Sequence, residues 1–315
     1  MKPAHRVVLV TGGAGFIGSH VVDLLLARDC HVLVLDDLSH GKRENLVVHQ
    51  DDPRMQLVAI DLRDDFAAAL AGLPRADAVI HLAAQISVPR SLEAPIVDLD
   101  INLRATVRLL QWAAAAGVPR FIMASSAAVY GELTRMPVSE DMCDRPSSPY
   151  GVSKRAAELY LHCLGPSLGV ETAALRLFNV YGPRQDPSSP YSGVVSQFMA
   201  RALAGEPLRI DGDGAQTRDF IHVRDVARAF LAALEVPQLG GLIANIGSAH
   251  ATTIAGLAAA IIAAAGSRSP IVHGPARAGD ILHSLAEVAR AKRTLAWTAE
   301  CSLAAGLADT LAWLR

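Results

Sequence analysis

An apolar run from Val7 to Val10 leads directly into a loop with glycines at positions 12, 15 and 18. The β-branched run predicts a buried strand. Phe16 and Ile17, between the second and third of these glycines, predict the start of a helix. In such a strand–turn–helix unit, glycine lets the backbone approach a pyrophosphate, and the free N–H groups at the helix start attract its negative charge. We therefore predict a dinucleotide-binding loop that uses Gly12, Gly15, Phe16, Ile17 and Gly18.

A second apolar run, residues 31–35, ends at the acidic pair Asp36 and Asp37. A carboxylate at that strand end can accept hydrogen bonds from the ribose hydroxyls of an adenosine, and it repels a 2′-phosphate. The pair therefore favours NAD over NADP as the cofactor, and a capping role for one carboxylate is compatible with this. After the next strand, Asp61 and Leu62 are candidates for contact with adenine, and a helix-capping role for Asp61 fits equally well.

Short β-branched runs alternate with helical patterns through the first half of the chain, which is typical of a parallel sheet covered by helices on both faces. We expect strands at 6–10, 31–35, 56–60, 78–82 and 120–124, and helices at 15–28, 64–71, 102–116 and 150–164. The rhythm then loosens, with strands expected at 172–177, 208–210 and 242–246, a loop at 182–193, and helices at 194–204, 223–235 and 254–265. The prediction is an α/β fold with a doubly wound parallel sheet at 1–177, rejoined by 223–250, and a smaller interleaved lobe at 178–315.

The bulk composition is that of an ordinary globular protein. Charged residues make up 19% of the 315 residues and the formal net charge is −2, so the charge balance favours neither nucleic acid nor an anionic membrane as a partner. The four cysteines are far apart and lack metal-ligand spacing, which favours reduced thiols over disulfides or a metal site. The first apolar run is too short for a signal peptide, and the alanine-rich stretch at 254–265 is too short to span a membrane. We expect a cytoplasmic protein.

The most specific catalytic signal is Tyr150, followed one helical turn later by Lys154, because residues at i and i+4 share a helix face. An ammonium held there stabilises a phenolate, which lowers the tyrosine pKa from about 10 towards the range in which a general base works. A tyrosine and a lysine at this spacing also occur by chance on solvated helix faces. Here the pair follows both the glycine-rich loop and the adjacent serines Ser125 and Ser126, and that order favours a catalytic role.

Further motifs complete the pattern, which resembles that of the extended short-chain dehydrogenase/reductase superfamily, in particular its NAD-dependent nucleotide-sugar epimerase/dehydratase family. The matching segments cover nearly the whole chain and are residues 11–18, 36–41, 81–85, 102, 125–131, 150–154, 179–185, 217–223 and 277–280. The resemblance implies a Rossmann-type NAD-binding domain with a C-terminal substrate-binding lobe. It also implies a homodimer in which the helices at 102–116 and 150–164 pair across a two-fold axis.

The resemblance implies a role for each matching position. Ser126 would hydrogen-bond the sugar O4, Tyr150 would remove the O4 proton, and Lys154 would bind the nicotinamide ribose. Further cofactor contacts are implied for Ser39, Gly41, Leu82, Ala83, Ala84, Gln85, Asn102 and Ser125. Substrate contacts are implied for Gln85, Asn179, Val194, Arg209, Arg218, Arg277, Asp280 and Ser284. Among these, the asparagine and the arginines at 218 and 277 would hold the diphosphate, since arginine pairs well with phosphate oxygens. The aspartate would hold the uridine ribose.

These residues and NAD suffice for a 4-epimerisation without net redox change. Tyr150 takes the O4 proton, hydride leaves C4, the 4-keto sugar turns over in the pocket, and the same hydride returns to its other face. The expected substrate is a UDP-hexose, UDP-glucose or UDP-galactose. Ser284 stands where relatives can place a bulky tyrosine, and a serine there leaves room for the 2-acetamido group of UDP-GlcNAc or UDP-GalNAc.

Relatives with other reactions differ at two places. Sugar-nucleotide dehydratases usually carry an Asp-Glu pair directly after the serine, where this chain has Ala127 and Ala128, so a dehydratase is disfavoured. Relatives that act on a uronic acid tend to have arginine where Asp186 stands, which favours a neutral hexose and leaves UDP-glucuronate 4-epimerase as an alternative. A nucleotide-4-keto-sugar reductase that consumes NADPH is a second alternative, which the acidic pair after the second strand disfavours. A non-catalytic dinucleotide sensor would not need the serine, the tyrosine and the lysine together.

Overall fold

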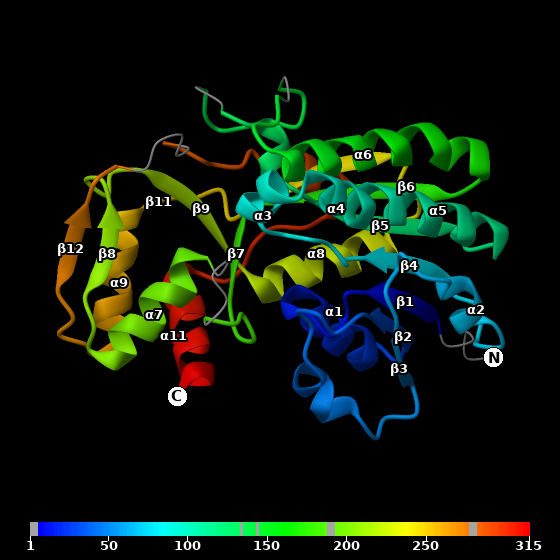
Figure 1. Ribbon diagram of the computed structural model, residues 1–315, viewed down its shortest axis with the longest axis horizontal. Coiled ribbons are helices and arrows are strands. Elements are labelled where there is room, and N and C mark those ends of the chain that lie inside the picture. Colours follow the sequence, from blue (N-terminus) through cyan, green and yellow to red (C-terminus); the bar gives the residue numbers. More distant parts are fainter. Residues whose placement is uncertain (1–5, 133–134, 143–144, 188–192, 277–281) are drawn as a thin grey trace.

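The computed structural model describes residues 6–132, 135–142, 145–187, 193–276 and 282–315. Its central feature is a seven-stranded sheet with the order β10-β6-β5-β4-β1-β2-β3, in which neighbouring strands are parallel (Figure 1). The strands are β1 (Val7–Thr11), β2 (His31–Asp36), β3 (Met55–Ala59), β4 (Ala78–His81), β5 (Arg120–Ser126), β6 (Glu171–Leu177) and β10 (Leu242–Ile246). The strand order reverses between β1 and β4, and open α/β sheets bind their ligands at such a point. The predicted α/β fold with a parallel sheet is confirmed.

Helices cover both faces of this sheet because successive side chains of a strand point to opposite faces. In β1, Val8 and Val10 belong to one apolar core and Leu9 to the other, and all three are fully buried. The first core is covered by α1 (Phe16–Ala27) and α8 (Val223–Glu235). The second is covered by α2 (Phe66–Leu70), α5 (Ala105–Ala115) and α6 (Pro149–Leu168).

Short helical turns fill the connections that follow the strands at the ligand-binding edge. After β2 comes the 3₁₀ helix η1 (Arg43–His49), and after β5 the 3₁₀ turn η3 (Ala127–Tyr130). The segment between β4 and α5 contains α3 (Val88–Glu93), α4 (Pro95–Leu99) and the π-helical turn η2 (Asp100–Arg104). The helices α3 and α4 and the turn η2 pack beside α6 and form one side of the site described below (Figure 1).

A smaller lobe with its own apolar core lies beside the carboxyl end of the main sheet (Figure 1). It contains a three-stranded sheet in the order β11-β9-β7 and a two-stranded sheet of β12 and β8. Its elements are β7 (Asn179–Tyr181), α7 (Val194–Ala204), β8 (Leu208–Asp211), β9 (Thr217–His222), β11 (Ala251–Thr253), α9 (Ile254–Ala265), β12 (Ile271–Gly274) and α11 (Leu303–Leu314). Its core is built from apolar faces of α7, α9 and α11, including Phe198, Leu257 and Leu307.

The chain passes between the two units more often than the sequence predicts. As expected, β10 pairs with β6 and so rejoins the main sheet. After the lobe strand β12, however, α10 (Ala289–Leu295) and Trp297 return to the first core, so that these residues do not belong to the lobe. Within the described residues, no helix combines the length and the apolar composition that a membrane-spanning segment needs.

Candidate active site

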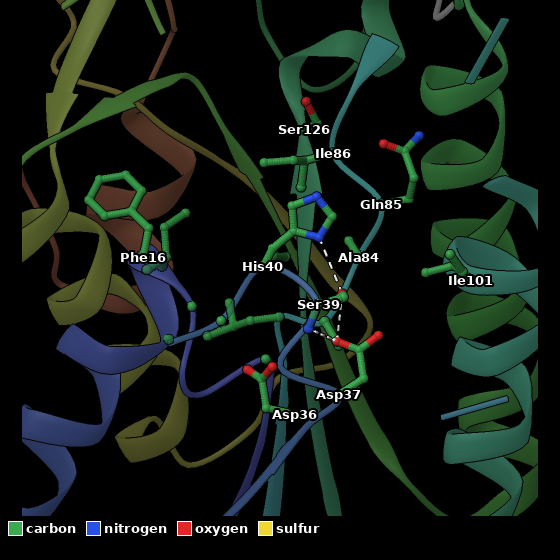
Figure 2. A pocket seen from close by; sticks show the side chains of 18 of the residues that line it. Phe16, Asp36, Asp37, Ser39, His40, Ala84, Gln85, Ile86, Ile101 and Ser126 are labelled. Carbon is green, nitrogen blue, oxygen red and sulfur yellow. Dashed lines mark hydrogen bonds between the residues drawn. The ribbon is translucent and has the colours of Figure 1, made fainter. Parts of the chain in front are cut away.

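A cavity of about 700 Å³ opens at the carboxyl ends of the strands on both sides of the β1–β4 switch point. Its size is typical of a site for a small molecule or cofactor. Figure 2 shows Asp36 and Asp37 towards one end of the cavity and Ser126 towards the other. The predicted cofactor residues that line it are Gly12, Gly15, Phe16, Ile17, Gly18, Asp36, Asp37, Ser39, Gly41, Asp61, Leu62, Leu82, Ala83, Ala84, Gln85, Ser125, Tyr150 and Lys154.

The glycine-rich loop has no room for side chains. Gly12 has a φ of +68°, and a Cβ atom there would lie 2.7 Å from the backbone nitrogen of Ala83. At Gly18 a Cβ atom would lie 2.0 Å from the carbonyl oxygen of Gly12. No side chain caps the N-terminus of α1, and its first turn contains no acidic residue, so its N–H groups are available to an anion at the cavity wall. This geometry fits the pyrophosphate of a dinucleotide.

The carboxylate at the end of β2 is held rigidly. Asp36 is only 6% exposed, and its two oxygens accept hydrogen bonds from the backbone N–H groups of Ala14 and Leu38, both at 2.9 Å. Burial raises its pKa, and these two hydrogen bonds act in the opposite direction. Each oxygen keeps a further lone pair for a ligand hydroxyl. Gly41 lies directly against the carboxylate, because a Cβ atom there would be 2.5 Å from Asp36 Oδ1.

Tyr150 and Lys154 lie in the first two turns of α6. The Ser148 side chain caps this helix by accepting a hydrogen bond from the Gly151 N–H at 3.2 Å. Gly151 also lets the helix approach η3, since a Cβ atom there would lie 2.5 Å from the carbonyl oxygen of Ala128. This close approach brings Tyr150 towards Ser126, the residue directly before η3. Sequence reasoning did not single out Gly151, although a glycine directly after the tyrosine was a visible signal.

The electrostatics of the pair differ from the sequence-based expectation. Burial raises the pKa of Tyr150, and a hydrogen bond with Ser126 acts in the opposite direction. Burial also lowers the pKa of Lys154 to about 8. The Lys154 ammonium donates a hydrogen bond to the carbonyl oxygen of Ala124 at 3.1 Å, which orients it along β5. For both buried groups, the loss of solvation changes the pKa more than the charge–charge interactions that helix spacing alone suggests.

Ser125 and Ser126 have different surroundings although they are adjacent. The Ser125 hydroxyl donates a hydrogen bond to Glu158, whose carboxylate forms a buried ion pair with Arg176 at 2.7 Å. The Ser125 hydroxyl is thus used by the scaffold beneath the cavity. The Ser126 side chain accepts a hydrogen bond from the Ala128 N–H at 3.2 Å and faces the cavity (Figure 2).

Gln85 and Asn102 form a buried wall. Asn102 is 1% exposed and does not line the cavity; its amide pairs with the backbone N–H and carbonyl of Gln85, both at 2.9 Å. The Gln85 side chain donates hydrogen bonds to the carbonyl oxygen of Ser87 and to Asp98. Both amides thus make hydrogen bonds within the wall, and the contacts of Asn102 with the cofactor and of Gln85 with the substrate stay predictions.

Comparison with known proteins gives the same picture. Residues 8–247 match the NAD dependent epimerase/dehydratase family. The chain belongs to that family. It is 40% identical to a UDP-glucose 4-epimerase of Mycolicibacterium smegmatis, over 98% of both chains. It is also similar to two solved structures: a UDP-glucose 4-epimerase of Thermotoga maritima with UDP-glucose (TM-score 0.92, 38% identity, 98% and 99% of the chains) and a UDP-N-acetylglucosamine 4-epimerase of Methanobrevibacter ruminantium with UDP-N-acetylmuramic acid (TM-score 0.93, 36% identity, 98% of both chains).

NAD is thus the cofactor of this epimerase/dehydratase family member, and the predicted cofactor and isomerase class are confirmed. The cavity residues fit that dinucleotide: a glycine loop without space for Cβ atoms, an uncapped helix N-terminus and a fixed carboxylate at the end of β2. The carboxylate also fits the preference for NAD over NADP.

The predicted substrate residues are less completely gathered than the cofactor residues. Asn179 lines the same cavity as Ser126 and Tyr150. Arg218 and Ser284 lie together, because the carbonyl oxygen of Thr217 accepts hydrogen bonds from the Arg218 guanidinium at 2.9 Å and from the Ser284 N–H at 3.1 Å. Like these two residues, Val194 and Arg209 do not line the cavity, and Arg209 forms an ion pair with Asp211 at 3.5 Å. Arg277 and Asp280 lie outside the described residues.

Lys42, a charged residue of the cavity, escaped the sequence analysis. Lys42 forms an ion pair with Asp186 at 2.6 Å, and both residues line the cavity. The charge of Asp186, which was expected to oppose a substrate carboxylate, is thus compensated by Lys42. Arg184 lines the same region and forms an ion pair with Asp23 of α1 at 2.8 Å. The basic residue directly after Gly41 was the available signal for Lys42, but its partner could only be identified in three dimensions.

Proposed function

We propose that this chain interconverts the C4 epimers of a UDP-hexose, with UDP-glucose and UDP-galactose as the first candidates. The observation that carries the proposal is the convergence of Ser126, Tyr150 and Lys154 on one region of the NAD cavity. Relatives of this chain over nearly its full length are UDP-glucose 4-epimerases, which supports the same reaction. The absence of acidic side chains at Ala127 and Ala128 disfavours loss of water.

In the proposed mechanism, the Tyr150 phenolate takes the proton from the sugar O4 while Ser126 holds that oxygen by a hydrogen bond. The bound NAD supplies reversible hydride acceptance at C4. The Lys154 ammonium stabilises the phenolate and fixes the ribose next to the reacting carbon. When the 4-keto sugar has turned over, Tyr150 returns the proton to O4, and the enzyme ends the cycle in its starting state.

The test is incubation of the purified, NAD-bound protein with UDP-galactose, UDP-glucose, their N-acetyl forms and UDP-glucuronate, with the C4 isomers resolved by NMR. Conversion of UDP-galactose and UDP-glucose into each other, without added NADH or NADPH, supports the proposal. Consumption of added reductant in proportion to product would instead identify a 4-keto-sugar reductase. Release of water from the sugar would identify a dehydratase.

Two observations bear on the alternative sugars. Because Lys42 compensates Asp186, the expected repulsion of a uronate is weaker than the sequence suggests, which favours UDP-glucuronate as the second candidate. Ser284 is partly exposed, and its backbone N–H donates a hydrogen bond to the Thr217 carbonyl oxygen. We propose that its small side chain leaves room for a 2-acetamido group. A Ser284→Tyr variant is expected to lose activity on the N-acetylated sugars first, and equal losses on both pairs of sugars would remove Ser284 from selectivity.

We also propose that the protein acts as a homodimer. Exposed apolar side chains gather on α3, α4 and α6, which pack together: Leu92 (63% exposed), Ile96 (69%), Val152 (53%), Leu159 (50%) and Tyr160 (46%). Contiguous apolar surface of this kind is typical of a protein–protein interface. Within the described part of the chain, α5 adds no large exposed apolar side chain, so the proposed interface is shifted from 102–116 towards α3 and α4.

A further inference from the structure

A carboxylate that the proposed mechanism does not use lies behind the cavity wall. Asp98, on α4, is 1% exposed and does not line the cavity. Burying a charged group to this extent destabilises the folded state unless hydrogen bonds compensate for the lost solvation. No arginine, lysine or histidine of the described residues forms an ion pair with it.

Three side chains from three different segments donate hydrogen bonds to Asp98. Its Oδ1 accepts from the Gln85 amide at 2.8 Å and from the Asn102 amide at 3.0 Å. Its Oδ2 accepts from the Ser153 hydroxyl at 2.6 Å. Gln85 belongs to the loop after β4, Asn102 to the π-helical turn and Ser153 to α6. A carboxylate that accepts from donors on both oxygens is well satisfied, and here it also joins the segments that form one side of the cavity.

Ser153 makes this network relevant to the reaction, because it lies between Tyr150 and Lys154 on the same helix. The network therefore reaches the reacting pair through one helical residue. The Ser153 hydroxyl also lies 3.0 Å from the carbonyl oxygen of Tyr150, and it can donate to only one of the two acceptors at a time. The contact with Asp98 is the shorter one.

The charge of Asp98 also acts on this pair directly. Burial is the main cause that raises the Tyr150 pKa, and the negative charge of Asp98 raises this pKa further. For Lys154, burial lowers the pKa, and the charges of Asp98 and Glu158 raise it. Glu158 is itself paired with Arg176 at 2.7 Å.

Two further charged groups complete these surroundings. Arg155 pairs with the same Glu158 carboxylate at 3.1 Å. On β4, burial lowers the pKa of His81 to about 3, so this residue is neutral and adds no charge near Lys154. Asp98 is therefore the carboxylate near the pair that forms no ion pair among the described residues, and Lys154 is the cation on which its charge acts.

We propose that Asp98 is a positioning residue: it ties Gln85, Asn102 and Ser153 together and keeps a negative charge without an ion-pair partner behind Tyr150 and Lys154. The proposal rests on the proposed role of Tyr150 as the base. Asp98 does not touch the substrate in this account. It sets the protonation of the pair and the placement of α6 relative to the loop after β4.

The Asp98→Asn variant separates charge from shape. The asparagine amide can donate to Ser153, whose hydroxyl then donates to the Tyr150 carbonyl, so the fold is expected to persist. Ionisation of Tyr150 is followed by tyrosinate absorbance in the NAD-bound protein, with Tyr150→Phe as the reference, and needs no substrate. We expect Tyr150 to ionise about half a unit to one unit lower in pH in Asp98→Asn than in wild type, because the variant lacks a negative charge near the phenolate. An unchanged titration overturns the charge part of the proposal.

Two further variants serve as controls for that measurement. Asp100→Asn removes a carboxylate two residues away, which lies next to Arg104 at 3.2 Å, and should leave the Tyr150 titration unchanged. Ser153→Ala changes no charge and should not move the titration, but it should lower kcat roughly tenfold with KM nearly unchanged, because α6 loses its tie to Asp98. If Asp98→Asn does not fold, the kcat of Ser153→Ala is the remaining test. A Ser153→Ala variant with the same kcat as wild type then overturns the proposal. If the wild type does not epimerise UDP-hexoses, the proposed function fails while the titration still tests Asp98.

Discussion

The Lys42 ammonium lies 2.6 Å from Asp186 Oδ2, although the two residues stand in loops far apart in the sequence. Lys42 follows β2 of the nucleotide-binding sheet, and Asp186 follows β7, the first strand of the lobe. Both residues line the cavity. The ion pair thus joins the two units of the protein at the edge of the cofactor site.

Loss of this ion pair should weaken the retention of NAD. The Asp186→Asn variant is expected to release NAD about two- to fivefold faster than wild type, since a partly exposed ion pair contributes at most about 1 kcal/mol. The difference should shrink at high salt, which screens exposed charges. Glu235→Gln is the matched control, because it breaks the exposed ion pair with Arg28 at 2.9 Å, away from the cavity. Equal release from wild type and Asp186→Asn at low salt would contradict the prediction.

Tyr150 should be needed for turnover and dispensable for the cofactor. A Tyr150→Phe variant is expected to keep bound NAD and lose about 10²–10⁴-fold in kcat, the usual contribution of a general base. Bound NAD is measured by absorbance after denaturation, and kcat by the conversion of UDP-galactose. Tyr160→Phe, on the same helix but outside the cavity, keeps the aromatic ring in the proposed dimer surface and should keep wild-type turnover. Undiminished kcat in Tyr150→Phe would remove this residue from the mechanism.

The activity should fall on the alkaline side as Lys154 loses its proton. Because burial lowers the Lys154 pKa to about 8, the ammonium is present below that pH and absent above it. Above pH 8 the Tyr150 phenolate loses its stabilising cation, so kcat/KM should decline as pH rises. In Lys154→Arg the charge persists throughout, and the decline should move to a higher pH. A decline at the same pH in both proteins would show that another group titrates there.

A charge on the apolar surface of α6 should dissociate the proposed dimer. Leu159→Arg is expected to sediment as a monomer at micromolar concentration, because an arginine cannot be buried there without a partner. Val48→Arg is the control, since Val48 is 70% exposed on η1, outside the surface formed by α3, α4 and α6. A wild-type protein that sediments as a monomer would refute the dimer itself.

The sheet and the cofactor loop could be predicted from sequence because their signals are local. An apolar run, a glycine spacing and a strand-terminal carboxylate are all visible over a few residues, and the structure places Gly12, Gly18 and Asp36 on one cavity. The helices α7, α8 and α9 also agree with their predicted bounds. By contrast, β7 and β11 have only three residues each, which is too short for a recognisable alternation.

The electrostatics of the site could not be predicted in this way because they depend on burial and on distant partners. Helix spacing correctly placed Lys154 one turn after Tyr150, but it could not reveal that both groups lose most of their solvation. Asn102 was assigned to the cofactor from its motif, whereas in the structure its amide pairs with the Gln85 backbone. Asp98 attracted no attention in the sequence, since a single aspartate on a short helix has no distinctive pattern.

The fate of the hydrogen at C4 tests the central claim most directly. UDP-galactose labelled with deuterium at C4 should be converted by the NAD-bound protein in ordinary water, without added cofactor. The account predicts UDP-glucose that still carries the deuterium at C4, because the same hydride leaves and returns within one active site. Product in which C4 carries hydrogen from the solvent, or no product unless NADPH is supplied, would contradict it.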